Sequence, residues 1–156
     1  MSTGKLARGI LLAVGAGFLW YNLSVSSSTI TIAGASMYPT LTDGQEAHIH
    51  IRSADEYPTR SEIIIIRRGD ENYVKRVIAL PGETLSIADD TVYVNGEAIC
   101  IENGIDPAIP DEWDYPITLA DDEYFVMGDN RTDSWDSRSQ SFGLVPLDEI
   151  LAIVEL

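Results

Sequence analysis

The sequence has 156 residues, of which 45% are hydrophobic and 22% are charged. This length and composition fit one folded domain with its own core and argue against a disordered chain. The net charge is −15, with 25 acidic against 10 basic residues, so the basic surface that nucleic acid requires is missing and no nucleic-acid partner is expected. The single cysteine, Cys100, rules out an intramolecular disulfide and thiolate zinc sites.

Residues 9–25 form an apolar run without a charge. A helix that spans a bilayer needs about 17 to 25 such residues, so this run is near the lower limit. Lys5 and Arg8 before the run, and Trp20 within it, predict a transmembrane anchor at 9–25, a cytoplasmic N-terminus at 1–8 and an extracytoplasmic domain at 26–156. A cleaved signal peptide and a buried helix are the alternatives. The anchor is favoured because no clean small-x-small cleavage site follows.

From residue 46 onward the pattern is typical of β-structure. Residues 46–52 alternate strictly, which predicts a strand with its alanine and both isoleucines on one face and with His48 and His50 on the other. Two histidines at this spacing could bind a metal, but no third ligand of suitable type lies close by. A solvated strand face is therefore favoured.

Four consecutive isoleucines in residues 62–68 predict a strand that is buried on both faces. A turn of about four residues and a second strand at 73–80 complete a predicted hairpin. Alternation and turn residues predict further strands at 84–87, 91–94, 97–101, 124–127 and within 144–154. Residues 102–122 are read as a long acidic surface excursion and 128–142 as a loop. The predicted fold is mainly β, an antiparallel domain of hairpins behind one N-terminal helix.

Ser36 lies in a stretch of small residues that is typical of a close backbone approach. Gly34 and Ala35 precede it, and Pro39 stiffens the chain beyond it. A serine held in this way could act as a nucleophile, but it needs a base to accept its proton.

The base is the open question, because a Ser-His-Asp triad needs a histidine and the two available ones are assigned to a solvated face. The serine also lacks the second glycine of a hydrolase nucleophile elbow. Lys75 is the alternative base, since alternation places it on one strand face with Tyr73 and Val77. Burial can lower a lysine pKa of about 10.4 by up to about 3–5 units. A solvated edge-strand lysine beside Arg76 explains the same spacing.

Three sequence blocks, in this order, resemble the bacterial type I signal peptidases, which are membrane-anchored Ser/Lys proteases. The blocks are residues 34–41, residues 73–83, and residues 127–138 followed by 142–146. The position of the blocks after an apolar N-terminal run agrees with the same family.

The resemblance implies a role for each matching position. Ser36 would be the nucleophile and Lys75 the general base, with the Ser36 N–H in the oxyanion hole and Gly34 where some members carry a hydroxyl donor. Ser134 would orient the lysine amine. The ion pairs that support the site would be Asp129 with Arg76 and Asp136 with Arg138. The shallow pockets for small substrate residues would be lined by Ile32, Met37, Leu41, Tyr73 and Val74.

The resemblance further implies signal-peptide-bearing preproteins as substrates, a lipid bilayer as partner, and no cofactor or metal. The sequence departs from the family pattern at two places. Ser61 and Glu62 stand where the family usually has a Gly-Asp pair, and Thr132 stands where an acidic residue is common. Two other functions stay open, a self-cleaving repressor-type Ser/Lys protease and a non-catalytic anchored β-module for surface-protein assembly. The apolar N-terminus argues against the first. The presence of both Ser36 and Lys75 argues against the second.

Overall fold

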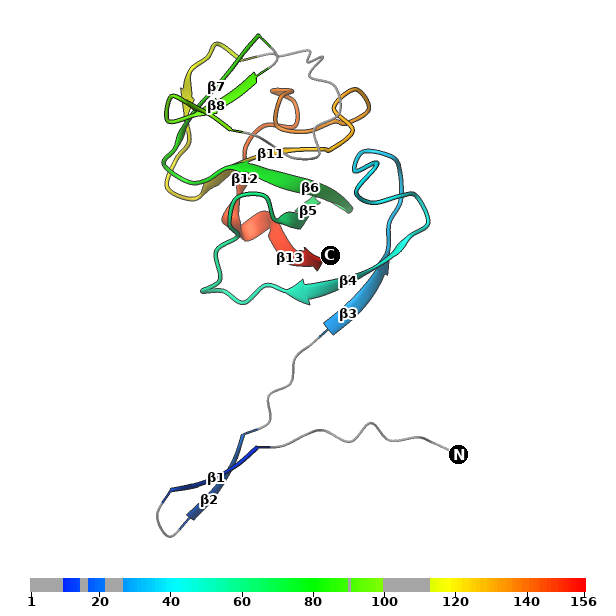
Figure 1. Cartoon of the computed structure of the whole chain (residues 1–156), viewed down its shortest axis with the longest axis vertical. Helices are drawn as coiled ribbons and strands as arrows, with labels where there is room; N and C mark the ends of the chain where they lie inside the picture. The colour runs from blue at the N-terminus through cyan, green and yellow to red at the C-terminus, as the bar shows by residue number, and fades with distance from the viewer. Residues whose placement is uncertain (1–9, 15–16, 22–26, 90, 100–112) are drawn as a thin grey trace.

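The protein is described here by a computed structural model that covers residues 10–14, 17–21, 27–89, 91–99 and 113–156. In these residues the fold is mainly β, as predicted, and consists of one large and one small antiparallel sheet with a separate N-terminal strand pair (Figure 1).

The large sheet has seven strands in the order β12-β11-β6-β5-β13-β4-β3. These are β3 (Ser27–Thr31), β4 (Glu46–Ile51), β5 (Ile63–Arg68), β6 (Glu71–Ala79), β11 (Glu123–Met127), β12 (Val145–Pro146) and β13 (Ile150–Glu155), with the 3-10 turn η1 (Leu147–Glu149) before β13. The last strand in chain order, β13, therefore lies in the interior of the sheet, between β5 and β4 (Figure 1).

The small sheet has four strands in the order β10-β7-β8-β9. They are β7 (Thr84–Ala88), β8 (Thr91–Val94), β9 (Glu97–Ala98) and β10 (Ile117–Thr118). Leu85, Val92 and Val94 from this sheet pack in one buried cluster with Phe125 and Met127 of β11. This contact attaches the small sheet to the strand that leads into the 128–142 loop.

The β5–β6 hairpin confirms the predicted buried strand, because all four isoleucines of β5 are buried. Its turn is shorter than predicted. Arg68 pairs with Glu71, so the loop is the two residues Gly69 and Asp70 rather than four. Gly69 has a φ of +60°, which glycine adopts without the steric cost that a side chain would add.

One face of β4 differs from its predicted pattern. Ala47 and Ile49 are buried as expected, but Ile51 at the end of the strand is 49% exposed. The cluster that covers the first two residues does not extend to Ile51. On the opposite face, His50 Nε2 pairs with Glu56 Oε2 at 3.0 Å.

The N-terminal apolar run is not a helix where the structure describes it. β1 (Ile10–Val14) pairs with β2 (Gly17–Tyr21) as an antiparallel ribbon. Apolar runs rich in aromatic and branched residues suit strands as well as helices, so hydrophobicity alone does not separate the two. The rest of the predicted anchor lies outside the described residues. Within those residues, no helix has the length and apolar character needed to cross a membrane.

Candidate active site

Ser36 lies in the loop between β3 and β4, and hydrogen bonds to the backbone of residues 34–36 hold it in place. The Asn130 N–H donates to the Ser36 carbonyl oxygen at 3.0 Å, and the Asn130 side chain donates to the Ala35 carbonyl at 3.1 Å. The Gly34 N–H donates to Asp43 Oδ1 at 2.8 Å, and its φ of +91° is one that glycine readily adopts. These bonds fix the serine itself and the two residues before it.

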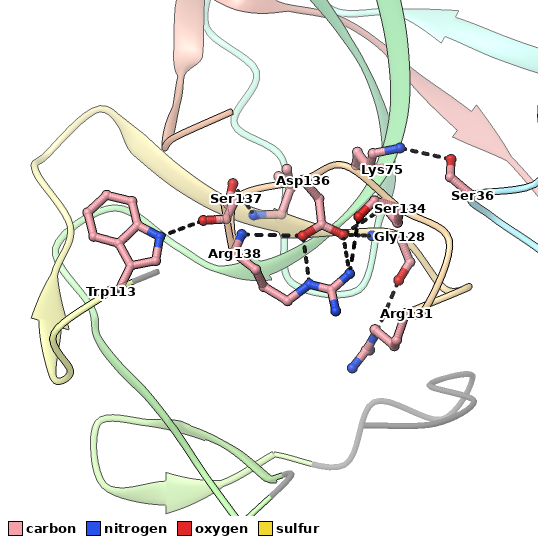
Figure 2. Close-up of polar contacts among 10 residues, drawn as sticks. Ser36, Lys75, Trp113, Gly128, Arg131, Ser134, Asp136, Ser137 and Arg138 are labelled. Atoms are coloured by element: carbon pink, nitrogen blue, oxygen red, sulfur yellow. Dashed lines mark hydrogen bonds and ion pairs between the residues drawn. The ribbon is translucent and has the colours of Figure 1, made fainter. Parts of the chain in front are cut away.

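Lys75 reaches this serine from the middle of β6. Its Nζ lies 2.8 Å from Ser36 Oγ, within hydrogen-bond distance (Figure 2). The lysine is only 3% exposed, which excludes the alternative of a solvated edge-strand lysine. The structure thus brings together the two residues that sequence analysis named as nucleophile and base.

Burial lowers the pKa of Lys75 to about 8. Desolvation is the main cause, because a buried ammonium loses its hydration. The Asp136 carboxylate opposes this shift, the Arg138 guanidinium adds to it, and Asp133 opposes it. A sizeable fraction of the amine is therefore neutral near neutral pH, as a general base requires.

Asp136 organises the loop beside the lysine. It forms two ion-pair hydrogen bonds with Arg138, both of 2.8 Å, and accepts one from the Gly128 N–H at 2.9 Å (Figure 2). The Ser134 hydroxyl donates to Asp136 Oδ2 at 2.7 Å. The predicted hydrogen bond between Ser134 and the Lys75 amine is not found among the described residues, where the Ser134 hydroxyl donates to Asp136 instead.

Gly128 lies close to both Ser36 and Ser134. A Cβ atom at this position would lie 2.3 Å from Ser134 Oγ and 2.5 Å from the Ser36 carbonyl oxygen. Real Cβ atoms do not come that close to such neighbours. The missing side chain therefore allows Ser36 and Ser134 to lie side by side.

The second predicted ion pair, Arg76 with Asp129, is also present and buried. The two N–O distances are 2.7 and 2.6 Å, a bidentate geometry. Thr40 Oγ1 donates to Asp129 Oδ2 at 2.5 Å, which ties the serine loop to the same carboxylate. Arg76 is the neighbour of Lys75 on β6, so this pair links the base strand to the serine loop.

A cavity of about 390 Å³ opens beside Ser36 and Lys75. It lies between the chain leading from β3 into the serine loop and the β6 residues that precede the lysine. Four of the five predicted pocket residues line it, namely Ile32, Met37, Tyr73 and Val74. Leu41 does not line this cavity, so this part of the prediction was wrong; it is fully buried in the same core cluster as Ile32 and Met37.

The resemblance predicts that the backbone N–H of Ser36 is a donor in the oxyanion hole. The Ser36 N–H has no acceptor among the described residues. The Gly34 N–H is already engaged with Asp43, and glycine supplies no hydroxyl. The Ser36 N–H is therefore free among the described residues to act as the predicted donor, and Gly34 adds no second one.

An aromatic cluster attaches the 134–142 loop to β6. Tyr73, Trp135 and Phe142 contact one another edge to face, with ring centroids 5.2 to 5.6 Å apart. Arg68 lies over the Phe142 ring, 4.5 Å from its centroid. The cluster keeps Ser134 and Asp136 next to the strand that carries Lys75.

Sequence reasoning missed four residues of this site: Thr40, Asp43, Gly128 and Asn130. Thr40, Gly128 and Asn130 stand inside the sequence blocks that resemble the family, so their position was a usable signal. Asp43 gave no signal, because an aspartate that bonds a nearby backbone N–H looks like any surface residue in the sequence.

A buried lysine lies within hydrogen-bond distance of a serine, and both side chains line one cavity. This is the geometry of a Ser/Lys hydrolase. Comparison with known proteins agrees with this class. Residues 4–156 match the family described as Signal peptidase, peptidase S26. The chain belongs to this family.

Individual relatives show the same relationship. The chain is 32% identical over 146 residues to signal peptidase I S of Bacillus subtilis (strain 168), covering 85% of this chain and 77% of the relative. It is 38% identical over 126 residues to a signal peptidase I of Bacillus licheniformis, covering 73% and 67%. The crystal structure of a signal peptidase I from Enterococcus faecalis V583 superimposes with a TM-score of 0.51 at 28% identity, covering 64% of this chain and 98% of the other.

Proposed function

We propose that this protein is a serine endopeptidase that removes signal peptides from exported preproteins, with Ser36 as nucleophile and Lys75 as general base. The 2.8 Å contact between Lys75 Nζ and Ser36 Oγ carries the proposal. Lys75 is buried, and Ser36 is its one hydrogen-bond partner among the described residues. The family and the curated relatives, all named signal peptidase I, support the substrate class.

The neutral Lys75 amine accepts the hydroxyl proton while Ser36 Oγ attacks the carbonyl carbon of the scissile bond. The Ser36 N–H donates to the oxyanion of the tetrahedral intermediate. Collapse breaks the carbon–nitrogen bond, and the Lys75 ammonium protonates the leaving amine. Water then attacks the acyl carbon while Lys75 accepts a proton from it, the bond between Ser36 Oγ and the acyl group breaks, and the Lys75 ammonium returns the proton to Ser36 Oγ.

The cavity beside the dyad accepts the residues before the scissile bond. Ile32, Met37 and Val74 give it an apolar lining next to the nucleophile. A small apolar side chain such as that of alanine packs against such walls.

The deciding experiment is cleavage of a preprotein with an Ala-x-Ala site by detergent-solubilised enzyme, with product masses determined. We expect Ser36→Ala and Lys75→Ala to abolish cleavage while retaining the fold, since each removes one half of the dyad. His50→Ala is the matched control, because a partly exposed histidine outside the site has no part in this mechanism. Turnover by either dyad variant, or loss of activity in the histidine variant, would overturn the assignment.

The same assay repeated across pH tests the base. The rate rises as pH passes through about 8, where Lys75 loses its proton. A flat profile between neutral and alkaline pH would exclude Lys75 as the base.

Signal peptidases of this family are in general membrane-associated. We propose that residues 9–25 attach this chain to the lipid bilayer, with residues 1–8 on the cytoplasmic side and the catalytic domain outside. The charged start and the uncharged run of the sequence support this arrangement. In intact spheroplasts, external protease is expected to degrade the catalytic domain; protection from the protease would reject the orientation.

A further inference from the structure

The buried charged side chains in the described part of the chain surround the active site and are unbalanced. Four are cations and two are carboxylates: Lys75, Arg76, Arg131, Arg138, Asp129 and Asp136. Even with Lys75 neutral, one buried positive charge is left over. This is notable in a chain whose net charge is −15, because acids are abundant on its surface.

The unmatched cation is Arg131. It is 6% exposed, and its Nε donates to the Gly128 carbonyl at 3.0 Å. Among the described residues its Nη2 has no hydrogen-bond partner and no carboxylate forms an ion pair with it. Both buried carboxylates are already engaged in bidentate pairs with other arginines. Arginine stays protonated at physiological pH, so its charge must be balanced by an anion.

Arg138 presents a second unused donor on the same side. Its Nε and Nη2 bind Asp136, while its buried Nη1 has no partner among the described residues. Figure 2 shows both guanidinium groups on the side of the 128–138 loop that faces away from Ser36. Together with Thr132 and Ser134 they line a cavity of about 340 Å³. Exposed Asp133 also lines the cavity and is the one acid there without an arginine pair among the described residues.

We propose that this cavity binds an oxyanion, a carboxylate or phosphate group, between the guanidinium groups of Arg131 and Arg138. The planar fork of N–H donors on each arginine suits the paired oxygens of such a group. Two sources supply this chemistry. One is a free anion in solution; the other is an acidic side chain in the part of the substrate that leaves, and this second source rests on the proposed function.

Ser134 and Asp136 line the anion cavity, and Asp136 also acts on the pKa of Lys75. Binding of an anion in this cavity is therefore coupled to catalysis. The charged groups that act on the lysine are Asp136 and Asp133, which raise its pKa, and Arg138, which lowers it. Desolvation is the main cause of the low Lys75 pKa, and the Arg138 charge adds to it. An anion on Arg138 offsets this added part and raises the Lys75 pKa. Binding of a free anion therefore slows cleavage at neutral pH, and the rate recovers at alkaline pH.

The first arm of the test measures binding without using activity. Lys5 and Lys75 are the two lysines of the sequence, so Lys5→Arg leaves Lys75 as the single lysine. In full-length protein labelled with ¹³C-lysine, the Lys75 signal is followed during titration with inorganic phosphate at constant ionic strength. We expect a saturable change in the signal and an upward shift of the Lys75 pKa.

Thr132→Asp places a carboxylate in the cavity and is expected to abolish the response to phosphate. Thr132→Asn introduces a neutral side chain of the same shape as aspartate and is expected to keep the response. Arg131→Gln provides a second loss variant in case the aspartate variant does not fold. A response that does not saturate, or that is equal in the two Thr132 variants, overturns the proposal.

The second arm identifies the source. Peptide substrates carry Glu or Gln at each of the first three positions after the scissile bond. A Glu preference of about tenfold in kcat/KM that disappears in Thr132→Asp assigns the site to substrate carboxylates. Equal cleavage of both peptides, with phosphate binding intact, assigns it to free anions. Equal cleavage without phosphate binding rejects the site. Failure to cleave any peptide contradicts the proposed function alone, because the phosphate titration still decides the site.

Discussion

At the scale of single residues, Lys75 is the group whose environment matters most. Folding buries its amine and lowers its pKa from 10.5 to about 8. Between these two values the unfolded chain binds a proton that the folded chain has released. The free energy of unfolding therefore rises with pH over this range, and below pH 8 the folded state bears the full cost of a buried ammonium.

Lys75→Met tests this cost. Replacing the amine by an apolar chain of similar length should raise the free energy of unfolding at pH 7 by about 3 kcal/mol at most, the equivalent of the pKa shift. The gain should shrink as pH rises from 8 toward 10.5. Urea unfolding of both proteins at several pH values measures it. A gain of the same size at every pH would mean that packing, not charge, is responsible.

The sequence was informative about residues whose role follows from local pattern. Lys75 could be proposed because alternation put it beside Tyr73 on one strand face, where burial was plausible. The partner of Ser134 could not be predicted, because whether a hydroxyl donates to Asp136 or contacts a lysine depends on a few tenths of an ångström. Leu41 was assigned to the pocket through the family resemblance, and the structure instead buries it in the core. A matching position in a sequence block does not show whether an apolar side chain faces the pocket or the core.

At the scale of elements, the loop from Gly128 to Arg138 positions the active site. It contacts the serine loop through Asn130, contacts the base strand through Trp135, and is closed on itself by Asp136. The prediction of a loop here was correct, but nothing in its sequence reports how closely it approaches Ser36. That closeness depends on tertiary packing at Gly128.

Gly128→Ala tests the role of this contact. The added methyl overlaps Ser134 Oγ and the Ser36 carbonyl, so the loop must move away by a substantial part of an ångström. We expect kcat to fall about 100-fold, as for misplaced catalytic groups in general. Gly96→Ala is the control, since it strains a turn with a φ of +82° but meets no atom within 4 Å. If both variants lose activity equally, the contact at Gly128 has no special role.

Strand pairing shows where sequence reasoning stops. Hairpins such as β5–β6 and β7–β8 could be predicted because turn residues join neighbouring strands. The pairing of β13 with β4 and β5 could not, since alternation reveals which face a strand buries but not which strand lies beside it. The strand β3 was missed as well, because its serine- and threonine-rich residues look like a linker.

At the scale of the whole molecule, the charge of −15 sets the response to salt. Repulsion among acidic side chains opposes the compact state, and screening relieves it. The midpoint of thermal unfolding should therefore rise by several degrees when NaCl is increased from about 0.05 M to about 1 M. At pH 4.2, the sequence pI, the same salt step should have little effect. An equal rise at both pH values would assign the effect to general salt stabilisation instead.

The position of β13 has a consequence for the moment at which the enzyme becomes active. The strand that follows the nucleophile loop, β4, and the hairpin that carries the base, β5–β6, are joined in the sheet through β13. During synthesis, both halves of the dyad are made well before the strand that unites them. In a chain that still lacks residues 150–155, the serine loop and the base strand are joined by side-chain contacts such as that of Thr40 with Asp129, but not by sheet hydrogen bonds. We therefore expect the dyad to reach its final geometry only when β13 is in place.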